Sequence, residues 1–257
     1  MKFRICFILF IYMLASIPSV GAVLEYKFKT GDVDKYKEVN KITFTSNIMG
    51  EEIIVKSSET LDVTETLIEE KDGIAKIKLS TKYKEITVDD EAADISKLPV
   101  DIFFFKINKQ GKIINILDSK EEPVKTFDPN KDTPMFIEKD LKVGDSWNGR
   151  WTVKGLDAKA KMSLVDLYSK NGIDVAKIKI DISDKIDVKE YAKDFPSISD
   201  IDGFMKINGT GYYYFAVNLG KDILIEYTAT VETIVKENNI EELFSKSEIQ
   251  HKYYRID

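Results

Sequence analysis

A short acidic segment near the middle of the chain has the ligand chemistry of a calcium loop. Asp128, Asn130 and Asp132 present side-chain oxygens at alternate positions, as the first positions of such a loop do. The pattern then fails, because Thr133 stands where the loop needs glycine and Lys139 where it needs glutamate. We therefore expect a polar linker here and predict no metal site in the chain.

Histidine and cysteine chemistry is limited by residue count. His251 is the only histidine and Cys6 the only cysteine, and Cys6 falls within an apolar N-terminal run. A catalytic triad needs a nucleophile and an orienting acid brought to the histidine, and the sequence marks neither. A carboxylate-based hydrolase is a remote alternative, since pairs among the 44 acidic residues mean nothing without geometry. We assign no catalytic residue and no cofactor, expect a non-enzymatic protein, and expect His251 at a surface or an interface.

Aromatic residues are the main candidates for ligand binding. The two tryptophans share one face of a predicted strand, and a tyrosine and a phenylalanine share one face of another. Two further phenylalanines belong to a run of three whose rings point to both faces of a strand. Either these side chains line a cavity for an apolar ligand, or they are ordinary core. The candidate cavity wall consists of Trp147, Trp151, Tyr213, Phe215, Phe103 and Phe105.

These residues must be positioned by strands that have one apolar face. In Asp174–Val188, isoleucine or valine alternates with lysine, aspartate or serine, a two-residue period typical of a half-buried strand. Gly73–Val88 repeats this pattern upstream. Short turns separate such runs, which indicates antiparallel hairpins. The other predicted strands are Leu24–Thr30, Tyr36–Ser46, Ile53–Ile68, Ile102–Ile107, Lys112–Leu117, Trp147–Val153, Lys159–Tyr168, Phe204–Leu219 and Ile223–Val235.

The same order of landmarks occurs twice along the chain. A Gly-Asp turn in Lys29–Asp32 precedes the first set of strands, and one in Lys142–Asp145 precedes the second. Each set then has an IAKIK or VAKIK strand, an insert, and a hairpin around asparagine and glycine. Coincidence among strands rich in lysine and isoleucine is the alternative. We predict an internal duplication, with a first β half at 23–120, a linker at 121–140, a second β half at 141–238 and a C-terminal tail at 239–257.

Three segments break the alternation and could cover the apolar side of a sheet. Asp89–Leu98 has acidic residues followed by alanines, which favours a short helix. Asp187–Asp202 is helical or irregular, and the tail can begin as a helix capped by Asn239. The predicted fold class is mainly β with a minor α part: a large curved antiparallel sheet or open half-barrel, with short helices covering the concave face.

The N-terminus has the features of an export signal. A basic start precedes an apolar run, and small residues end at Ala22, so we predict that residues 1–22 are a signal peptide. Cleavage leaves 36 basic and 44 acidic residues, a net charge of −8, which argues against nucleic acid as a partner. We expect an exported protein of the periplasm, cell envelope or extracellular space, with no transmembrane anchor after cleavage.

The layout resembles a known family. A signal segment, an opening strand ending in Gly31-Asp32, long antiparallel strands, a central insert and a closing hairpin with Gly220-Lys221 are similar to the half-barrel envelope proteins of the lipoprotein-carrier type (LolA/LolB-like). The resemblance covers most of the mature chain as strand order and turn placement, and the doubled layout departs from it. It implies a concave apolar cavity that holds acyl chains.

From these observations we expect a secreted, non-enzymatic envelope protein that binds an apolar ligand, a lipid or lipid-linked molecule, in the cavity of a curved β-sheet. The alternative is a structural or interaction module that docks a protein partner through its sheet. The expected partners are accordingly an apolar small molecule or lipid, or another envelope protein.

Overall fold

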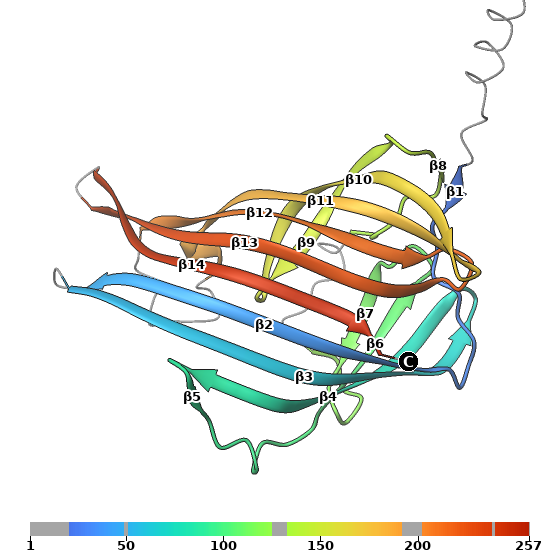
Figure 1. Cartoon of the computed structure of the whole chain (residues 1–257), viewed down its shortest axis with the longest axis horizontal. Coiled ribbons are helices and arrows are strands. Elements are labelled where there is room, and N and C mark those ends of the chain that lie inside the picture. Colours follow the sequence, from blue (N-terminus) through green and yellow to red (C-terminus); the bar gives the residue numbers. More distant parts are fainter. Residues whose placement is uncertain (1–20, 49–50, 125–132, 192–201, 238–239, 257) are drawn as a thin grey trace, which may run out of the picture.

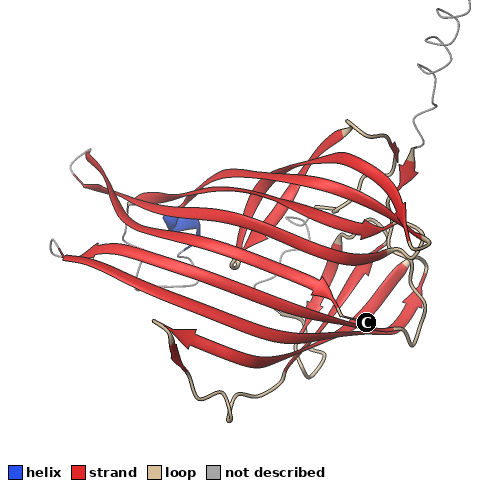
Figure 2. Cartoon of the chain, in the orientation of Figure 1, coloured by secondary structure: helices blue, strands red, loops and turns tan. Residues whose placement is uncertain are grey.

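The chain folds into one large, curved, antiparallel β-sheet (Figure 1). The computed structural model describes residues 21–48, 51–124, 133–191, 202–237 and 240–256. Within them nearly every element is a strand (Figure 2). The strands of the large sheet are β2 (Val33–Ile48), β3 (Glu51–Lys71), β4 (Ile74–Val88), β5 (Glu91–Ala92), β6 (Asp101–Asn108), β7 (Ile113–Leu117), β9 (Ser146–Val153), β10 (Leu156–Lys170), β11 (Ile173–Asp187), β12 (Gly203–Ala216), β13 (Lys221–Glu237) and β14 (Ile240–Arg255).

Neighbouring strands are mostly consecutive in the chain, and the order across the sheet is β7-β6-β4-β3-β2-β14-β13-β12-β11-β10-β9. There are two exceptions: β4 pairs with β6 because β5 lies off this path, and β14 pairs with β2 from Ser245↔Ser46 to Arg255↔Tyr36. The edge strands β7 and β9 are not paired with each other, so the sheet stays open. A large curved antiparallel sheet that does not close into a barrel confirms the predicted fold class.

The two-residue alternation predicts the inner face correctly. Along β11, Ile178 and Ile180 are fully buried, whereas Lys177 and Lys179 between and beside them keep contact with solvent. The same inner face carries a large hydrophobic core over β9–β13 and two small clusters over β2–β6. The second half of the sheet is therefore well filled, and the concave side of the first half is covered more sparsely.

The prediction that short helices cover the concave face is wrong for the described residues. The helix found among these residues, α2 (Val188–Tyr191), is a single turn. None of the described residues forms a helix long and apolar enough to cross a bilayer. Asp89–Leu98 is also not helical. Asp89 and Asp90 take positive φ values of 50° and 67° and turn the chain into the short strand β5. Aspartate tolerates this left-handed region and bonds locally to backbone, which explains the turn.

The C-terminal tail is a strand, not a helix. β14 lies between β13 and β2, with Ile249 buried and Tyr253 stacked on Tyr36 at 4.6 Å between ring centroids. Alternate residues from Ile249 to Tyr253 face inward, so burial on a sheet face outweighs the weak helix-cap signal at the start of the segment. This strand joins the two halves of the sheet.

The predicted first strand, Leu24–Thr30, is instead an extended strap. Only β1 (Ala22–Val23) pairs, with β8 (Asp140–Leu141), in a small second sheet. Beyond it, Tyr26 N donates to Lys109 O at 2.8 Å and Lys27 N donates to Gly220 O at 3.2 Å. The strap thus ties together the β6–β7 and β12–β13 turns, and its apolar side chains enter the interior instead of extending a ladder.

The two Gly-Asp turns have the same local geometry. Gly31 and Gly144 have φ values of 90° and 100°, and their amides donate to Leu67 O at 2.9 Å and Leu164 O at 2.8 Å, respectively. Each of these leucines faces an isoleucine of an AKIK strand and is followed by a register irregularity. An internal duplication would produce such matching contacts in the two halves. The boundaries of the halves stay a prediction.

Candidate functional site

A cavity of about 530 Å³ lies on the concave side of the sheet, next to the two edge strands. We call it the central cavity. The edge strand β9 contributes Trp151, and the opposite edge strand β7 contributes Ile113. Met135 and Ile225 complete an apolar wall, whereas Glu38, Asn40, Lys154 and His251 form a polar wall. A cavity of this size with apolar walls and a few polar groups is typical of a small-molecule site.

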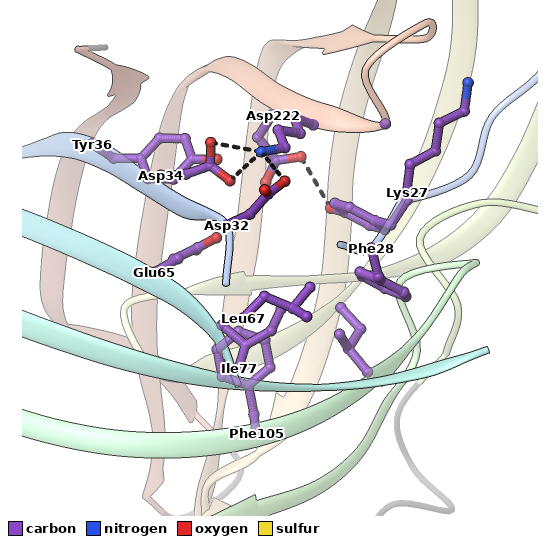
Figure 3. A pocket seen from close by; sticks show the side chains of 14 residues that line it. Lys27, Phe28, Asp32, Asp34, Tyr36, Glu65, Leu67, Ile77, Phe105 and Asp222 are labelled. Atoms are coloured by element: carbon purple, nitrogen blue, oxygen red, sulfur yellow. Dashed lines mark hydrogen bonds and ion pairs between the residues drawn. The ribbon is translucent and has the colours of Figure 1, made fainter. Parts of the chain in front are cut away.

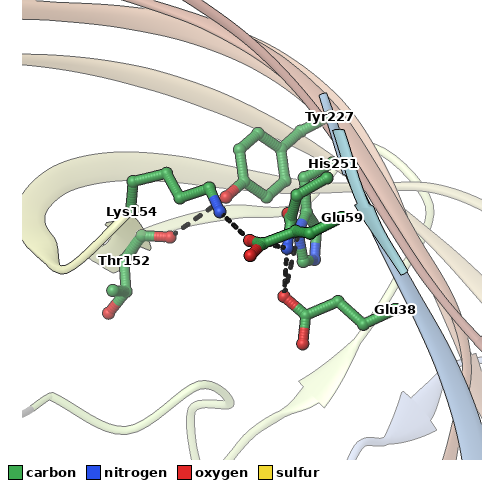
Figure 4. A network of polar contacts seen from close by, with 7 residues as sticks. Glu38, Glu59, Thr152, Lys154, Tyr227 and His251 are labelled. Carbon is green, nitrogen blue, oxygen red and sulfur yellow. Dashed lines mark hydrogen bonds and ion pairs between the residues drawn. The ribbon is translucent and has the colours of Figure 1, made fainter. Parts of the chain in front are cut away.

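The polar wall is organised by Asn40, which is 3% exposed (Figure 4 shows its neighbours). Its Nδ2 donates to Glu38 Oε1 at 2.7 Å and to Glu59 Oε1 at 3.0 Å. Because carboxylates only accept hydrogen bonds, the amide nitrogen must face them and Oδ1 must face His251. The distance from His251 Nδ1 to Asn40 Oδ1 is 2.7 Å. Nδ1 therefore carries the hydrogen and donates it to Asn40.

His251 is held as a neutral ring. Burial, with a smaller effect of the positive charge of Lys154, lowers the pKa of His251 to about 4. Its ring stacks on Tyr227 with 4.7 Å between centroids, and the Tyr227 hydroxyl donates to Thr152 O at 3.4 Å. With Nδ1–H bonded to Asn40, the neutral ring keeps Nε2 as its acceptor.

Lys154 reaches this network from the tip of the β9–β10 hairpin (Figure 4). Lys154 and Gly155 have φ values of 48° and 80°, the geometry of a two-residue turn that usually takes asparagine or aspartate at its first position. The Lys154 ammonium group forms an ion pair with Glu59 on the inner face of β3. The hairpin tip is thereby tied to the far side of the concave face.

A second, smaller pocket of about 120 Å³ lies beneath the N-terminal strap (Figure 3). We call it the carboxylate pocket. Lys221 Nζ lies 3.0 Å from Asp32 Oδ2 and 2.8 Å from Asp34 Oδ2. Asp222 accepts hydrogen bonds from the hydroxyls of Tyr26, at 3.1 Å, and Tyr213. These bonds join the strap to the start of β13.

Glu65 and Asp222 in this pocket hold protons more strongly than ordinary carboxyls. Burial, aided by the negative charge of Asp222, raises the pKa of Glu65 to about 8. Burial also raises the pKa of Asp222, although its hydrogen bonds from Tyr213 and Tyr26 oppose the shift. Glu65 Oε1 further accepts from the Tyr253 hydroxyl at 3.0 Å. At neutral pH the Glu65 carboxyl in this pocket is therefore mainly protonated.

The six predicted wall residues divide between these places. Trp147, Tyr213 and Phe215 are buried in the large core, as the alternative interpretation of ordinary core predicts. Trp151 touches the same core and lines the central cavity. Phe105 lines the carboxylate pocket. Phe103, 42% exposed, lies on the inner face opposite Leu79. The structure thus places these residues on one face but brings only part of them to a cavity.

The metal hypothesis has no counterpart in the described residues, where no group of three or more histidine, cysteine, aspartate or glutamate side chains could hold a metal ion. The calcium-like segment Asp128–Asp132 lies outside the described residues, as does the predicted signal segment up to residue 20.

Sequence reasoning missed the polar wall of the central cavity. Glu38 and Asn40 occupy the same phase of β2 as Tyr36 and Ile42, so polar residues stand at positions that should be apolar. Such an inward-facing polar pair is a readable signal. Its partner Lys154 could not be found in this way, because only the fold of the β9–β10 hairpin brings it near.

The comparisons with known proteins concern the arrangement of strands. No family model and no curated protein matches the chain. A structure of lipovitellin, described for its lipid–protein interactions, is similar with a TM-score of 0.49 and 10% identity over 90% of this chain; the chain spans 26% of that one. OmpF of Salmonella typhi in complex with daunomycin has a TM-score of 0.27 at 8% identity, covering 90% of this chain and 100% of that chain. An outer membrane channel from Pseudomonas putida F1 has a TM-score of 0.24 at 7% identity, covering 94% and 99%.

Proposed function

We propose that this chain is an exported, non-enzymatic β-sheet protein that binds an apolar small molecule or lipid in its central cavity. The observation that carries the proposal is the cavity itself, about 530 Å³ between an apolar wall and a polar wall on the concave face. Because the apolar wall buries carbon surface and the polar wall fixes orientation, the fitting ligand is an amphiphile with one apolar chain.

The position of the cavity supports binding from the open side of the sheet. Trp151 of β9 and Ile113 of β7 belong to the two edge strands, so the cavity adjoins the gap that a closed barrel would lack. A chain-like ligand inserted there would contact both edges of the sheet. The hairpin tip with Lys154 would cover its polar end.

Filling the cavity tests this function. Ile225→Trp adds an indole on the cavity side of β13, whereas Leu224→Trp adds the same group on the opposite face of that strand. With N-phenyl-1-naphthylamine as a fluorescent apolar probe, the unaltered protein and Leu224→Trp should bind. Ile225→Trp should bind at least about tenfold more weakly, since the side chain occupies the site. Equal binding by all three proteins would refute the cavity as the site.

A second candidate function, docking of a protein partner, is favoured by one observation. Exposed apolar side chains gather where β3 begins and where β14 begins: Ile53, Ile54, Leu243 and Phe244 are 41%, 50%, 55% and 47% exposed. The first partner to test is a second copy of the chain. Sedimentation velocity of the protein and of Ile54→Ser/Phe244→Ser would show association lost in the variant if this candidate is right.

A carboxylate-based hydrolase has less support. Such chemistry requires one acid with a raised pKa beside a second, ionised carboxylate, whereas the pKa values of Glu65 and Asp222 are both raised. In addition, the carboxylate pocket measures about 120 Å³, whereas small-molecule sites usually measure about 300 Å³ or more. We therefore propose that these acids hold protons beneath the strap. A hydrolase is the least supported of the three functional hypotheses.

A further inference from the structure

One carboxylate that lines the central cavity, Glu38, has no lysine or arginine partner in the described part of the chain. Glu38 is the carboxylate in the cavity lining, and Arg150 and Lys154 are the cations. Lys154 pairs with Glu59 and Arg150 pairs with Asp157. Glu38 is left with neutral neighbours: it accepts from the Asn40 amide and lies 3.7 Å from the uncharged His251. Among the described residues no lysine or arginine pairs with Glu38.

Within the network of Glu38, Asn40, His251 and Tyr227, the groups left without a partner are acceptors. The donor groups of Asn40 are used by Glu38 and Glu59, and Nδ1–H of His251 is used by Asn40. The Tyr227 hydroxyl donates to Thr152 O. The acceptors left in this network are the carboxylate of Glu38 and Nε2 of His251. The negative charge of Glu38 also attracts a cation that has no N–H group.

Aromatic rings adjoin this acceptor site. Trp151 and Tyr227 both line the cavity, with 6.1 Å between ring centroids and an interplanar angle of 89°. An aromatic face beside a carboxylate favours an ammonium group, because the ring quadrupole and the negative charge both attract a cation. A carboxylate ligand would meet the unpaired charge of Glu38, while the one ammonium group nearby, Lys154, is already neutralised by Glu59.

We propose that the central cavity selects amphiphiles whose polar head is an ammonium group, primary or quaternary, and rejects fatty acids. This inference rests on the proposed function, since it names the ligand class of the same site. The ammonium head lies at Glu38, His251 and the two aromatic rings, and the hydrocarbon chain lies along Met135 and Ile225.

Three ligands that share a ten-carbon chain test the head-group preference: decyltrimethylammonium, decanol and decanoate, each below its micelle concentration. Their displacement of N-phenyl-1-naphthylamine is measured at pH 7.5 and at low and high salt. The cation should bind about tenfold more tightly than decanol, and decanoate more weakly than decanol. High salt should reduce the differences in affinity between the three ligands.

Glu38→Gln removes the unpaired charge but keeps an acceptor for Asn40. It should lower the affinity for decyltrimethylammonium about tenfold and leave that for decanol unchanged. The matched control is Glu226→Gln, which removes a charge from the outer face of β13 next to Tyr227. It should bind as the unaltered protein does.

The outcomes distinguish the head-group preference from the proposed binding of an apolar ligand. Equal affinity for all three ligands, tighter binding of decanoate, or no effect of Glu38→Gln would overturn the head-group preference, while decanol binding would still support an apolar-ligand site. If none of the three ligands displaces the probe, both proposals fail.

Discussion

Lys154, at the tip of the β9–β10 turn, forms an ion pair with Glu59 of β3 although the two residues lie 95 positions apart in the chain. β9 is an edge strand whose ladder partner is β10 alone, so this pair anchors the free side of the hairpin. It also sets the charge of the central cavity. The same contact therefore serves both the shape of the site and its electrostatics.

Removal of this ion pair should loosen the hairpin without unfolding the protein. The two side chains are 29% and 27% exposed, and such pairs contribute about 1 kcal/mol or less. We expect Lys154→Gln to change the free energy of unfolding by no more than about 1 kcal/mol. Hydrogen exchange of the β9 amides should become faster, as measured by mass spectrometry. Lys159→Gln, which breaks the pair with Asp184 in β11, is the control and should leave β9 exchange as it was. Unchanged exchange in Lys154→Gln would show that the pair does not anchor the hairpin.

Glu65 should make the protein less stable as pH rises through neutrality. Its pKa is about 8 in the folded protein and 4.5 as an isolated side chain, so the folded state holds a proton that the unfolded state has lost between these values. The contribution is fully present below pH 4.5 and declines by about 1.4 kcal/mol per pH unit up to pH 8. Between pH 6.5 and 8 the loss is about 2 kcal/mol.

Urea denaturation at pH 6.5 and 8 measures this effect. Glu65→Gln should abolish the difference, because glutamine does not titrate. Asp62→Asn, on the outer face of β3, should retain it. An equal pH dependence in the protein and in Glu65→Gln would rule out Glu65 as its source.

His251 should titrate far below a free histidine. Its pKa is about 4 in the folded protein against 6.5 when exposed, so between these values the unfolded state binds the additional proton. Stability from this residue is complete above pH 6.5 and falls on acidification to pH 4, by about 3 kcal/mol at most. Glu65 has the opposite slope from pH 4.5 upward and partly masks the effect in denaturation curves.

Because the chain has one histidine, NMR can follow this ring directly. The imidazole resonances should stay at their neutral positions down to about pH 5. The urea-unfolded protein should titrate near 6.5 and provides the reference. A midpoint near 6.5 in the folded protein would contradict the neutral, Asn40-bonded ring.

Gly211 should be required for the close approach of β12 and β13. A Cβ atom there would overlap the carbonyl oxygen of Glu226 and the Cβ of Tyr227, which are parts of a paired strand. At Gly149 an added Cβ meets mainly the terminal methyl group of Met162, which can move. Thermal or urea denaturation should show a loss of about 3 kcal/mol for Gly211→Ala and about 1 kcal/mol for Gly149→Ala. Losses of equal size would mean that the strand separation at Gly211 adapts freely.

Local sequence patterns predicted most strands of the sheet but not the positions of the N-terminal strap and the C-terminal tail. The alternation in Asp174–Val188 and Gly73–Val88 is a property of each strand alone, and it matches β11 and β4 closely. Whether Leu24–Thr30 joins a ladder or crosses the interior depends on free hydrogen-bonding edges elsewhere, which no local pattern records. The helix prediction for the C-terminal tail was wrong for the same reason. β14 is a strand because it pairs with β13 on one side and with β2 on the other.

The site shows a similar division. Aromatic type and strand phase selected Trp151 and Phe105, which line the central cavity and the carboxylate pocket, respectively. Tyr213 is instead fully buried and stacks on Phe136, with 6.0 Å between ring centroids, and Phe136 comes from a segment without periodicity. The carboxylate pocket joins Asp32 to Lys221 across 189 positions. Contacts of this range come from the topology of the sheet and leave no trace in local spacing.

The chain contains two tryptophans, which allows the ligand to be located directly. Trp151 lines the central cavity, whereas Trp147 is buried with its Nε1 donating to Met135 O at 2.9 Å. The decisive measurement is quenching of tryptophan fluorescence by a decyltrimethylammonium ligand that carries bromine in its chain. Trp147→Phe, which retains Trp151, should be quenched on binding, and Trp151→Phe should be quenched little. Quenching in Trp151→Phe alone, or none in either variant, would contradict ligand binding in the central cavity.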